Sequence, residues 1–275
     1  MKKLLFFLLI FNLLYPLEKY KETDILSVWK VEGSNAELIL HKEKDGLGFL
    51  NSHRRQKELW DIVSKFYPSE ITNRITTFIV FADNSENNNG GMFGLIETEN
   101  NENKKFILSL DIEDSYYGNY LDLESLLSLL VHEFFHIVSL GHEELSKENT
   151  GGLKLFEGYA RKSSYLNKFY EKFWENSLGK KLELLEENPN LSPEEKRQIR
   201  KNYYEQNRDK FVNDYGMTNV VEDIAVSFEE FVRTNKNQLK SRVKDEKIIF
   251  FYSYPKLIEY KNYFLERRKE LLKKQ

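Results

Sequence analysis

The residues of this chain that could do chemistry are concentrated in the segment His132-Glu133-Phe134-Phe135-His136. On a helix, histidines four residues apart lie one turn apart on nearly the same side, so His132 and His136 can bind one metal ion. Glu133 is one step round the helix, within reach of a water molecule on that metal. In this H-E-x-x-H arrangement two neutral imidazoles hold Zn²⁺, the bound water becomes acidic, and the carboxylate accepts its proton. The segment therefore predicts hydrolysis by zinc-activated water.

The apolar surroundings of this segment add weight to a pattern that is common by chance. A helix that is apolar all round is buried, and the flanking residues are Leu126, Leu127, Leu129, Leu130 and Val131 before the segment and Ile137, Val138 and Leu140 after it. Two buried histidines and a glutamate without partners would cost several kcal/mol. A bound metal removes that cost, and hydrogen-bonded core histidines are the alternative.

Zinc in such a site needs a third protein ligand, and three residues are candidates. His142 would complete the metzincin pattern, but Ser139 stands where that pattern has a glycine. Glu157 follows His136 by 21 residues and resembles the zinc-binding glutamate of thermolysin-like and aminopeptidase-like enzymes. The alternatives are an exposed histidine after a helix and a surface glutamate in a first helical turn.

Glu222 is the favoured third ligand because it falls at the margin of a buried helical face. The apolar stripe of its helix consists of Val221, Ala225, Phe228 and Val232. We expect Asp223 and Glu230 to point away from that face. A carboxylate at the edge of such a face can reach a metal in the core. The alternative is a capping box, because Asn219 precedes Glu222 by three residues.

The segment around His132, together with Tyr215 and Glu222, resembles gluzincin peptidases of the lethal-factor and Pro-Pro-endopeptidase type. In those enzymes a later helix carries the zinc-binding glutamate, and a tyrosine seven residues before it faces the site, which is the spacing found here. A broader set of exported bacterial metallopeptidases is similar over roughly 75–232. That set has a strand ending in Asp-Ile, then H-E-F-x-H, an aromatic stretch like 164–170, and E-D-x-A.

The resemblance implies a role for each residue of the site. His132, His136 and Glu222 would bind zinc, Glu133 would be the general base, and Tyr215 would polarise the substrate carbonyl or stabilise the oxyanion. A phenol suits that role because it is a neutral donor whose hydrogen bond strengthens as negative charge develops; an ordinary core tyrosine is the alternative.

Two features depart from these families. Val226 stands where the exported set often has a second acid, and the gap between His136 and Glu222 is longer than in the toxin enzymes.

Composition narrows the classes of function. The chain has 275 residues, of which 40% are hydrophobic, enough for a sizeable core. Its net charge of −3 gives no electrostatic case for nucleic acid as a partner. The absence of cysteine excludes disulfides, thiolate ligands and cysteine nucleophiles.

The N-terminus has the layout of a secretory signal. Lys2 and Lys3 precede an apolar run from Leu4 to Leu17, which is short for a membrane-spanning helix. We expect residues 1–18 to direct export to the cell envelope or the medium. No small-x-small cleavage pattern follows, so an uncleaved anchor touching the membrane and a buried N-terminal helix are the alternatives.

The remaining chain, 19–275, is expected to form one catalytic domain of the α+β class with a zincin-like fold. Expected strands are Ile75–Phe81, Met92–Glu97 and Phe106–Ile112, with a loop at Asn84–Gly91. Expected helices are Arg55–Phe66, Leu121–Leu140, Leu155–Trp174, one beginning at Ser192, Val220–Val232 and Leu257–Leu272. Either of the last two strands is a candidate edge along which an extended peptide substrate would lie.

The expected function is therefore zinc-dependent peptide-bond hydrolysis by an exported metalloendopeptidase. The rival is a zinc-binding envelope module without catalysis, which would have no use for Glu133 beside the metal. A metal-free structural domain is a second rival.

Overall fold

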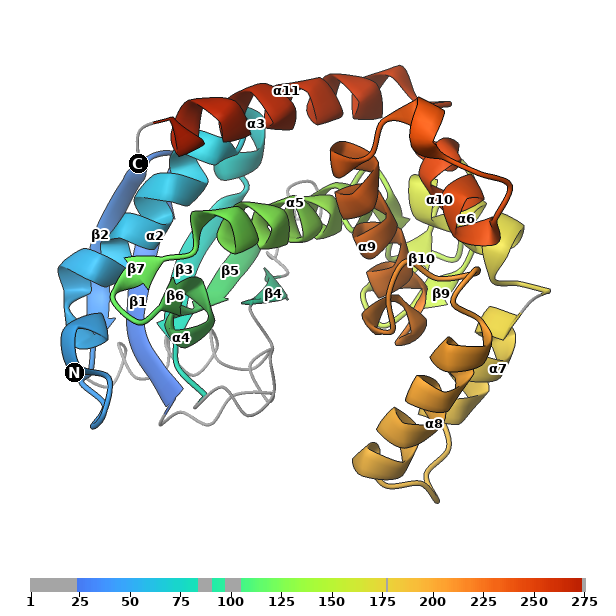
Figure 1. The fold of residues 1–275 in the computed structure, drawn as a ribbon, viewed down its shortest axis with the longest axis horizontal. Coiled ribbons are helices and arrows are strands. Elements are labelled where there is room, and N and C mark those ends of the chain that lie inside the picture. Colours follow the sequence, from blue (N-terminus) through green and yellow to red (C-terminus); the bar gives the residue numbers. More distant parts are fainter. Residues whose placement is uncertain (1–23, 84–90, 97–104, 177, 274–275) are drawn as a thin grey trace. The chain divides into compact units, whose positions relative to one another are not determined.

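The computed structural model describes residues 24–83, 91–96, 105–176 and 178–273 (Figure 1). The chain divides into two compact units, 1–133 and 134–275, with the division inside helix α5, Leu123–Ser139. The expected export segment, 1–18, and nearly all of the expected loop at Asn84–Gly91 lie outside the described residues, so both stay predictions. Within the described part of the chain, no helix is both long enough and apolar enough to cross a membrane.

The first unit is built on a five-stranded sheet with the strand order β2-β1-β3-β5-β4. The strands are β1 (Ile25–Glu32), β2 (Asn35–His41), β3 (Ile75–Phe81), β4 (Gly91–Ile96) and β5 (Lys105–Asp111). The neighbours β3 and β5 run parallel, and the other neighbours are antiparallel. All but one residue of β3 are buried, as its continuous apolar sequence requires.

Three of these strands agree with the sequence-based expectation to within one residue, and two were missed. The missed strands β1 and β2 pair through a two-residue turn at Gly33, which has φ +57°. The expectation that 106–112 offers an open edge is wrong, because β5 is hydrogen-bonded to β3 on one side and to β4 on the other. The edge strand on that side of the described sheet is β4.

Helices and a small hairpin complete the first unit. They are α2 (His53–Phe66), α3 (Ser69–Thr72), α4 (Ile112–Ser115), the 3₁₀ turn η3 (Gly48–Asn51) and the two-stranded sheet β6 (Tyr116–Tyr117) and β7 (Tyr120–Leu121). One side of helix α2 is buried, including Leu59, Trp60, Val63 and Phe66. Trp60 on this side lies against Phe78 of β3, with ring centroids 5.4 Å apart, so α2 covers the sheet.

The second unit is mainly helical. Its helices are α6 (Tyr165–Phe173), α7 (Leu178–Glu186), α8 (Pro193–Gln206), α9 (Val220–Arg233), α10 (Val243–Phe251) and α11 (Pro255–Leu272), with 3₁₀ turns η4 (Tyr215–Met217) and η5 (Lys236–Gln238). Helix α9 packs against α6, α10 and α11. The described chain is therefore α+β, with a small N-terminal sheet and a mainly helical C-terminal part.

The expected helix Leu155–Trp174 is wrong in its first half. That half forms the strands β9 (Lys154–Leu155) and β10 (Gly158–Ala160), which pair with β8 (Leu145–Ser146) in the order β8-β10-β9. Gly158 has φ +139°, a conformation outside any helix. The helix α6 begins only after Ser164, whose hydroxyl accepts a hydrogen bond from the Asn167 backbone N–H at 3.0 Å.

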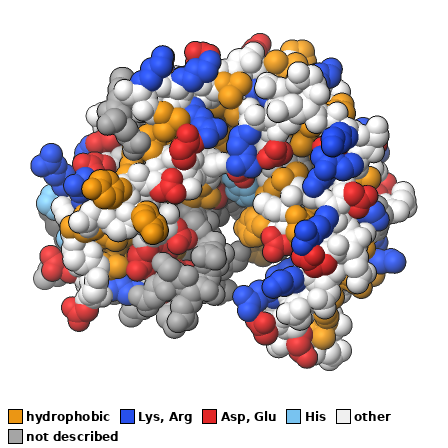
Figure 2. All heavy atoms as spheres, in the orientation of Figure 1, with side chains coloured by type: hydrophobic (Ala, Val, Ile, Leu, Met, Phe, Trp, Pro, Cys, Tyr) orange, Lys and Arg blue, Asp and Glu red, His pale blue; other side chains and the backbone are white. Residues whose placement is uncertain are grey.

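The charged stretch after α6 forms two helices that pack together, α7 and α8. The start of α8 was correctly predicted, and Ser192 and Glu195 form a complete capping box there. Figure 2 shows acidic and basic side chains interspersed on the face drawn. Ion pairs three residues apart on one helix include Glu194–Arg197, Glu266–Lys269 and Arg267–Glu270.

Candidate metal centre

Helix α5 buries the three residues that the sequence marks for metal chemistry. His132 and His136 are each 6% exposed and Glu133 is 3% exposed. The helix begins after Asp122, whose carboxylate accepts from the backbone N–H and hydroxyl of Ser125. Because the helix is regular through the segment, the two imidazoles lie one turn apart on it, as predicted.

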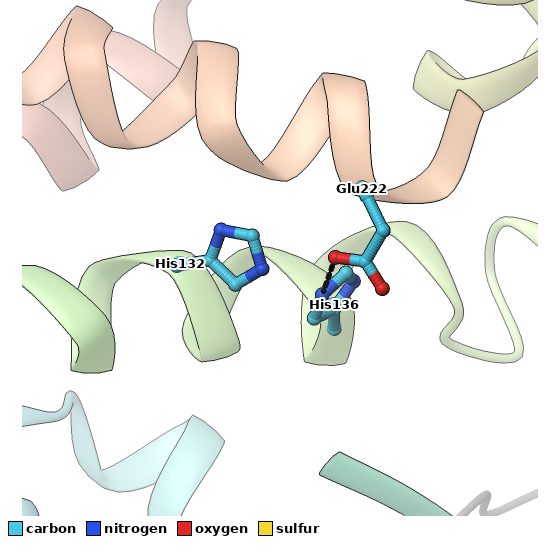
Figure 3. A group of neighbouring side chains, drawn as sticks. All are labelled: His132, His136 and Glu222. Atoms are coloured by element: carbon cyan, nitrogen blue, oxygen red, sulfur yellow. Dashed lines mark ion pairs between the residues drawn. The ribbon is translucent and has the colours of Figure 1, made fainter. Parts of the chain in front are cut away.

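Glu222 meets His136 from the first turn of α9. The Asn219 side chain begins that helix by accepting hydrogen bonds from the backbone N–H groups of Val221 and Glu222, each at 2.9 Å. A carboxylate oxygen of Glu222 lies 3.3 Å from Nε2 of His136, and its side chain is 20% exposed. Figure 3 shows this contact, with the His132 ring nearby on α5. The acidic residue is thus partly buried against an imidazole.

The three side chains fit a divalent metal ion. One ligand atom from each of His132, His136 and Glu222 lies within 4.8 Å of the others. Two ligands bound to zinc at tetrahedral positions are about 3.4 Å apart, close to the 3.3 Å between His136 and Glu222. Two neutral nitrogens and one carboxylate oxygen form a donor set that zinc accepts in catalytic sites. This buried group could therefore hold a metal ion.

The other two candidates for the third ligand lie outside this group. The imidazole of His142 is 39% exposed and contacts Glu143 at 3.2 Å, as expected for a histidine that follows a helix. Glu157 lies in the turn between β9 and β10 and not on a helix, so the expected likeness of its position to that in thermolysin-like enzymes is wrong.

Tyr215 lies on the 3₁₀ turn η4, which packs against α9. It is 47% exposed, so it is not an ordinary core tyrosine. The structure thus places Tyr215 on the element that leads into the helix carrying Glu222, and its role in catalysis stays a prediction.

Asp223 corrects the expected orientation of α9. We expected this residue to point away from the buried face, but it is fully buried. Glu230, the other residue expected to point away, is partly buried, with 29% of its side chain exposed. Val226, one turn after Glu222, is buried and apolar. A buried carboxylate therefore directly follows Glu222 in α9.

Sequence reasoning also missed Tyr67, a buried residue that contacts α5. Its hydroxyl donates a hydrogen bond of 2.7 Å to the backbone carbonyl of Leu130. Burial raises the pKa of Tyr67 well above its ordinary value, and the negative charge of Glu133 raises it further. Tyr67 therefore lies within electrostatic reach of Glu133. No local pattern could have shown this, because the two residues are far apart in the sequence.

Comparisons of the chain with protein families, with curated proteins and with solved structures find no match.

Proposed function

We propose that this chain is an exported zinc-dependent peptidase with a zincin-like fold that cleaves peptide bonds. The observation that carries the proposal is the convergence of His132, His136 and Glu222, with Glu133 buried next to the first histidine. Zinc, when bound, would supply an acidified water and a Lewis acid for the substrate carbonyl. In this proposal His132, His136 and Glu222 hold the metal through two nitrogens and one oxygen, which leaves a position for water.

Glu133 is the proposed general base. It follows His132 directly, so its side chain leaves α5 one step round from the proposed ligands. Its carboxylate would accept a proton from the attacking water and hand it to the leaving amine. Tyr215 is the proposed donor to the substrate carbonyl oxygen, where negative charge develops. Its exposed position allows contact with a substrate.

Matched variants and metal analysis test the proposal. Purified protein that has never met a chelator should carry about one zinc per chain, and removing the metal should lower the melting temperature, because a ligand that binds the folded state stabilises it. Glu133→Gln should keep the zinc and lose about 10²- to 10⁴-fold in turnover of a cleaved peptide. Glu222→Ala should weaken zinc binding itself, and Tyr215→Phe should keep zinc and lose rate.

Glu157→Ala is the control for the third ligand, because this glutamate lies outside the metal group. It should leave zinc and turnover unchanged. Protein that neither carries nor takes up zinc would refute the metal site. Full activity of Glu133→Gln would refute the mechanism, and zinc binding without any turnover in the wild type would favour the non-catalytic envelope module.

A further inference from the structure

A buried charged cluster includes Asp223, in the first turn of α9. One oxygen of Asp223, Oδ2, accepts from Nζ of Lys247 at 2.6 Å and from Nε1 of Trp174 at 2.7 Å. The two charged side chains are 0% and 2% exposed, and Trp174 is also fully buried. We call Asp223, Lys247 and Trp174 the anchor cluster.

The anchor cluster connects separate parts of the second unit at one point. Asp223 follows Glu222 in α9, Lys247 lies in α10, and Trp174 directly follows α6. The turn η4 also packs here, since a Cβ atom on Gly216 would lie 3.3 Å from Oδ1 of Asp223. Two residues of the proposed site are therefore sequence neighbours of residues in this contact. Glu222 directly precedes Asp223, and Tyr215 directly precedes Gly216.

Stability alone is a poor explanation for such a cluster. Burial raises the pKa of Asp223 and lowers that of Lys247, and each charge partly offsets the shift of the other. Removing two charges from water carries a large free-energy cost, and well-packed apolar residues often give equal or greater stability. Lys247 also lies 3.8 Å from the centroid of the Phe211 ring, in surroundings that would accept an apolar side chain. The polar groups instead fix the relative positions of the helices that carry them, because hydrogen bonds hold atoms at set distances and angles.

We propose that Lys247, Asp223 and Trp174 are positioning residues that hold the start of α9 so that Glu222 faces His136 as a zinc ligand. They do not touch the metal; they fix the backbone from which Glu222 projects. The inference rests on the proposed zinc site and goes beyond it, because it assigns a role in metal affinity to residues outside the ligand set.

The opposite end of α9 supplies a matched control. Nζ of Lys261 donates to the backbone carbonyls of Phe231 and Thr234, the latter at 2.6 Å. Lys261 is 7% exposed, so it is a second buried lysine that holds the same helix. Its contacts lie roughly 14–18 Å from Glu222 along the helix axis, at 1.5 Å per residue. Loss of Lys261 should therefore loosen α9 without displacing Glu222.

The test measures the zinc dissociation constant by competition with a chromophoric chelator, alongside the melting temperature of the metal-free protein. The main variant combines Asp223→Asn with Lys247→Met, because changing both partners leaves no unpaired buried charge and the amide oxygen can still accept from Trp174. This variant should fold and bind zinc about tenfold or more weakly, as for residues that orient ligands. Lys261→Met should lower the melting temperature and leave the dissociation constant within about twofold, since distant sites act independently.

Cobalt substitution gives a readout that a general loss of stability would not change. The visible absorption of bound Co²⁺ depends on ligand geometry, so the spectrum should change in the double variant and stay unchanged in Lys261→Met. Wild-type zinc affinity and an unaltered cobalt spectrum in a folded double variant would overturn the inference and leave the proposed peptidase intact. An equal loss of affinity in Lys261→Met would also overturn it, because any loosening of α9 would then suffice.

Trp174→Phe decides the question if the double variant does not fold. This change removes the Nε1 donor and keeps the ion pair, so zinc binding should weaken in the same direction. Unchanged affinity would reject the anchor cluster as a positioning device. If the wild-type protein binds no zinc, both the proposed function and this inference are refuted.

Discussion

Helices α5 and α9 supply the candidate ligands, and they are held in different ways. Around His132 and His136 on α5 the neighbouring side chains are apolar and buried, including Phe134, Phe135 and Ile137, all at 0% exposure. On α9, Glu222 is instead followed by a buried carboxylate that binds a lysine and a tryptophan. Both helices share apolar packing, since Phe228 of α9 stacks on Phe135 of α5, but beside its candidate ligand α9 also has a buried polar cluster.

The difference has consequences for how each helix responds to substitution. Apolar packing is non-directional and tolerates changes that conserve volume. A buried hydrogen-bonded ion pair does not, because removing one partner leaves a charge without compensation. The histidines should therefore survive conservative changes around them, whereas Glu222 should be sensitive to the loss of a few polar atoms.

The largest expected effect comes from truncating a buried aromatic side chain of α5. The Phe135 ring stacks on Phe228 with centroids 4.3 Å apart and contacts Phe251. Phe135→Ala should lower the free energy of unfolding by about 3–5 kcal/mol, as for other large-to-small core changes. Phe135→Leu should cost less and keep the zinc. Urea denaturation in the presence of chelator measures the first effect, and metal content measures the second. A folded Phe135→Leu protein without zinc would break the comparison, since packing on α5 would then be as exacting as the contacts on α9.

A smaller effect is expected on the pH dependence of the unfolding free energy, through Glu144. This residue contacts the start of α6, the helix that Trp174 directly follows. Its carboxylate accepts from the Tyr165 backbone N–H at 2.5 Å, and burial raises the pKa of Glu144 from 4.5 to about 7. Because the folded-state pKa is the higher one, the folded protein prefers protonated Glu144. This contribution to stability is present at low pH and is lost as pH rises through about 7.

Glu144→Gln should remove this dependence, because the amide remains neutral and can still accept from the backbone. Between about pH 5 and pH 8 the wild type should lose about 2 kcal/mol more unfolding free energy than the variant does. Urea denaturation at several pH values checks the difference. Parallel pH profiles for the two proteins would show that Glu144 does not contribute.

The smallest expected effect concerns Tyr67, whose hydroxyl makes a polar contact with the backbone of α5. Tyr67→Phe removes the hydrogen bond to the Leu130 carbonyl and should cost about 1 kcal/mol in unfolding free energy. Zinc content should not change, because packing still holds the histidines. Loss of zinc in this variant would show that α5 also depends on a single directed contact, and the distinction between the two helices would fail.

Elements with a strong local signal were predicted from the sequence to within about two residues. The strand β3 and the helices α2, α5, α9 and α11 belong to this group. The helix expected at Leu155–Trp174 failed in its first half because Gly158 adopts a positive φ within a hairpin. The strands β1 and β2 were missed, and the one-domain expectation for 19–275 stays a prediction.

What the sequence by itself determined is the part of the candidate site that depends on local geometry. Residues four apart on a helix lie on one side whatever the rest of the chain does, so the pairing of His132 with His136 could be predicted. The apolar flanks likewise predicted burial, and the spacing between Tyr215 and Glu222 drew attention to a carboxylate that lies against His136.

Only the tertiary structure decided which distant groups meet. The contact between Glu222 and His136, the burial of Asp223 against Lys247, and the hydrogen bond from Tyr67 to Leu130 all join residues far apart in the chain. The first contact was expected from the apolar stripe of α9 and the resemblance, whereas the other two follow no periodicity that could be recognised in advance. Each depends on how whole helices pack, and a charged residue such as Asp223 is predicted to face water unless its buried partner is known.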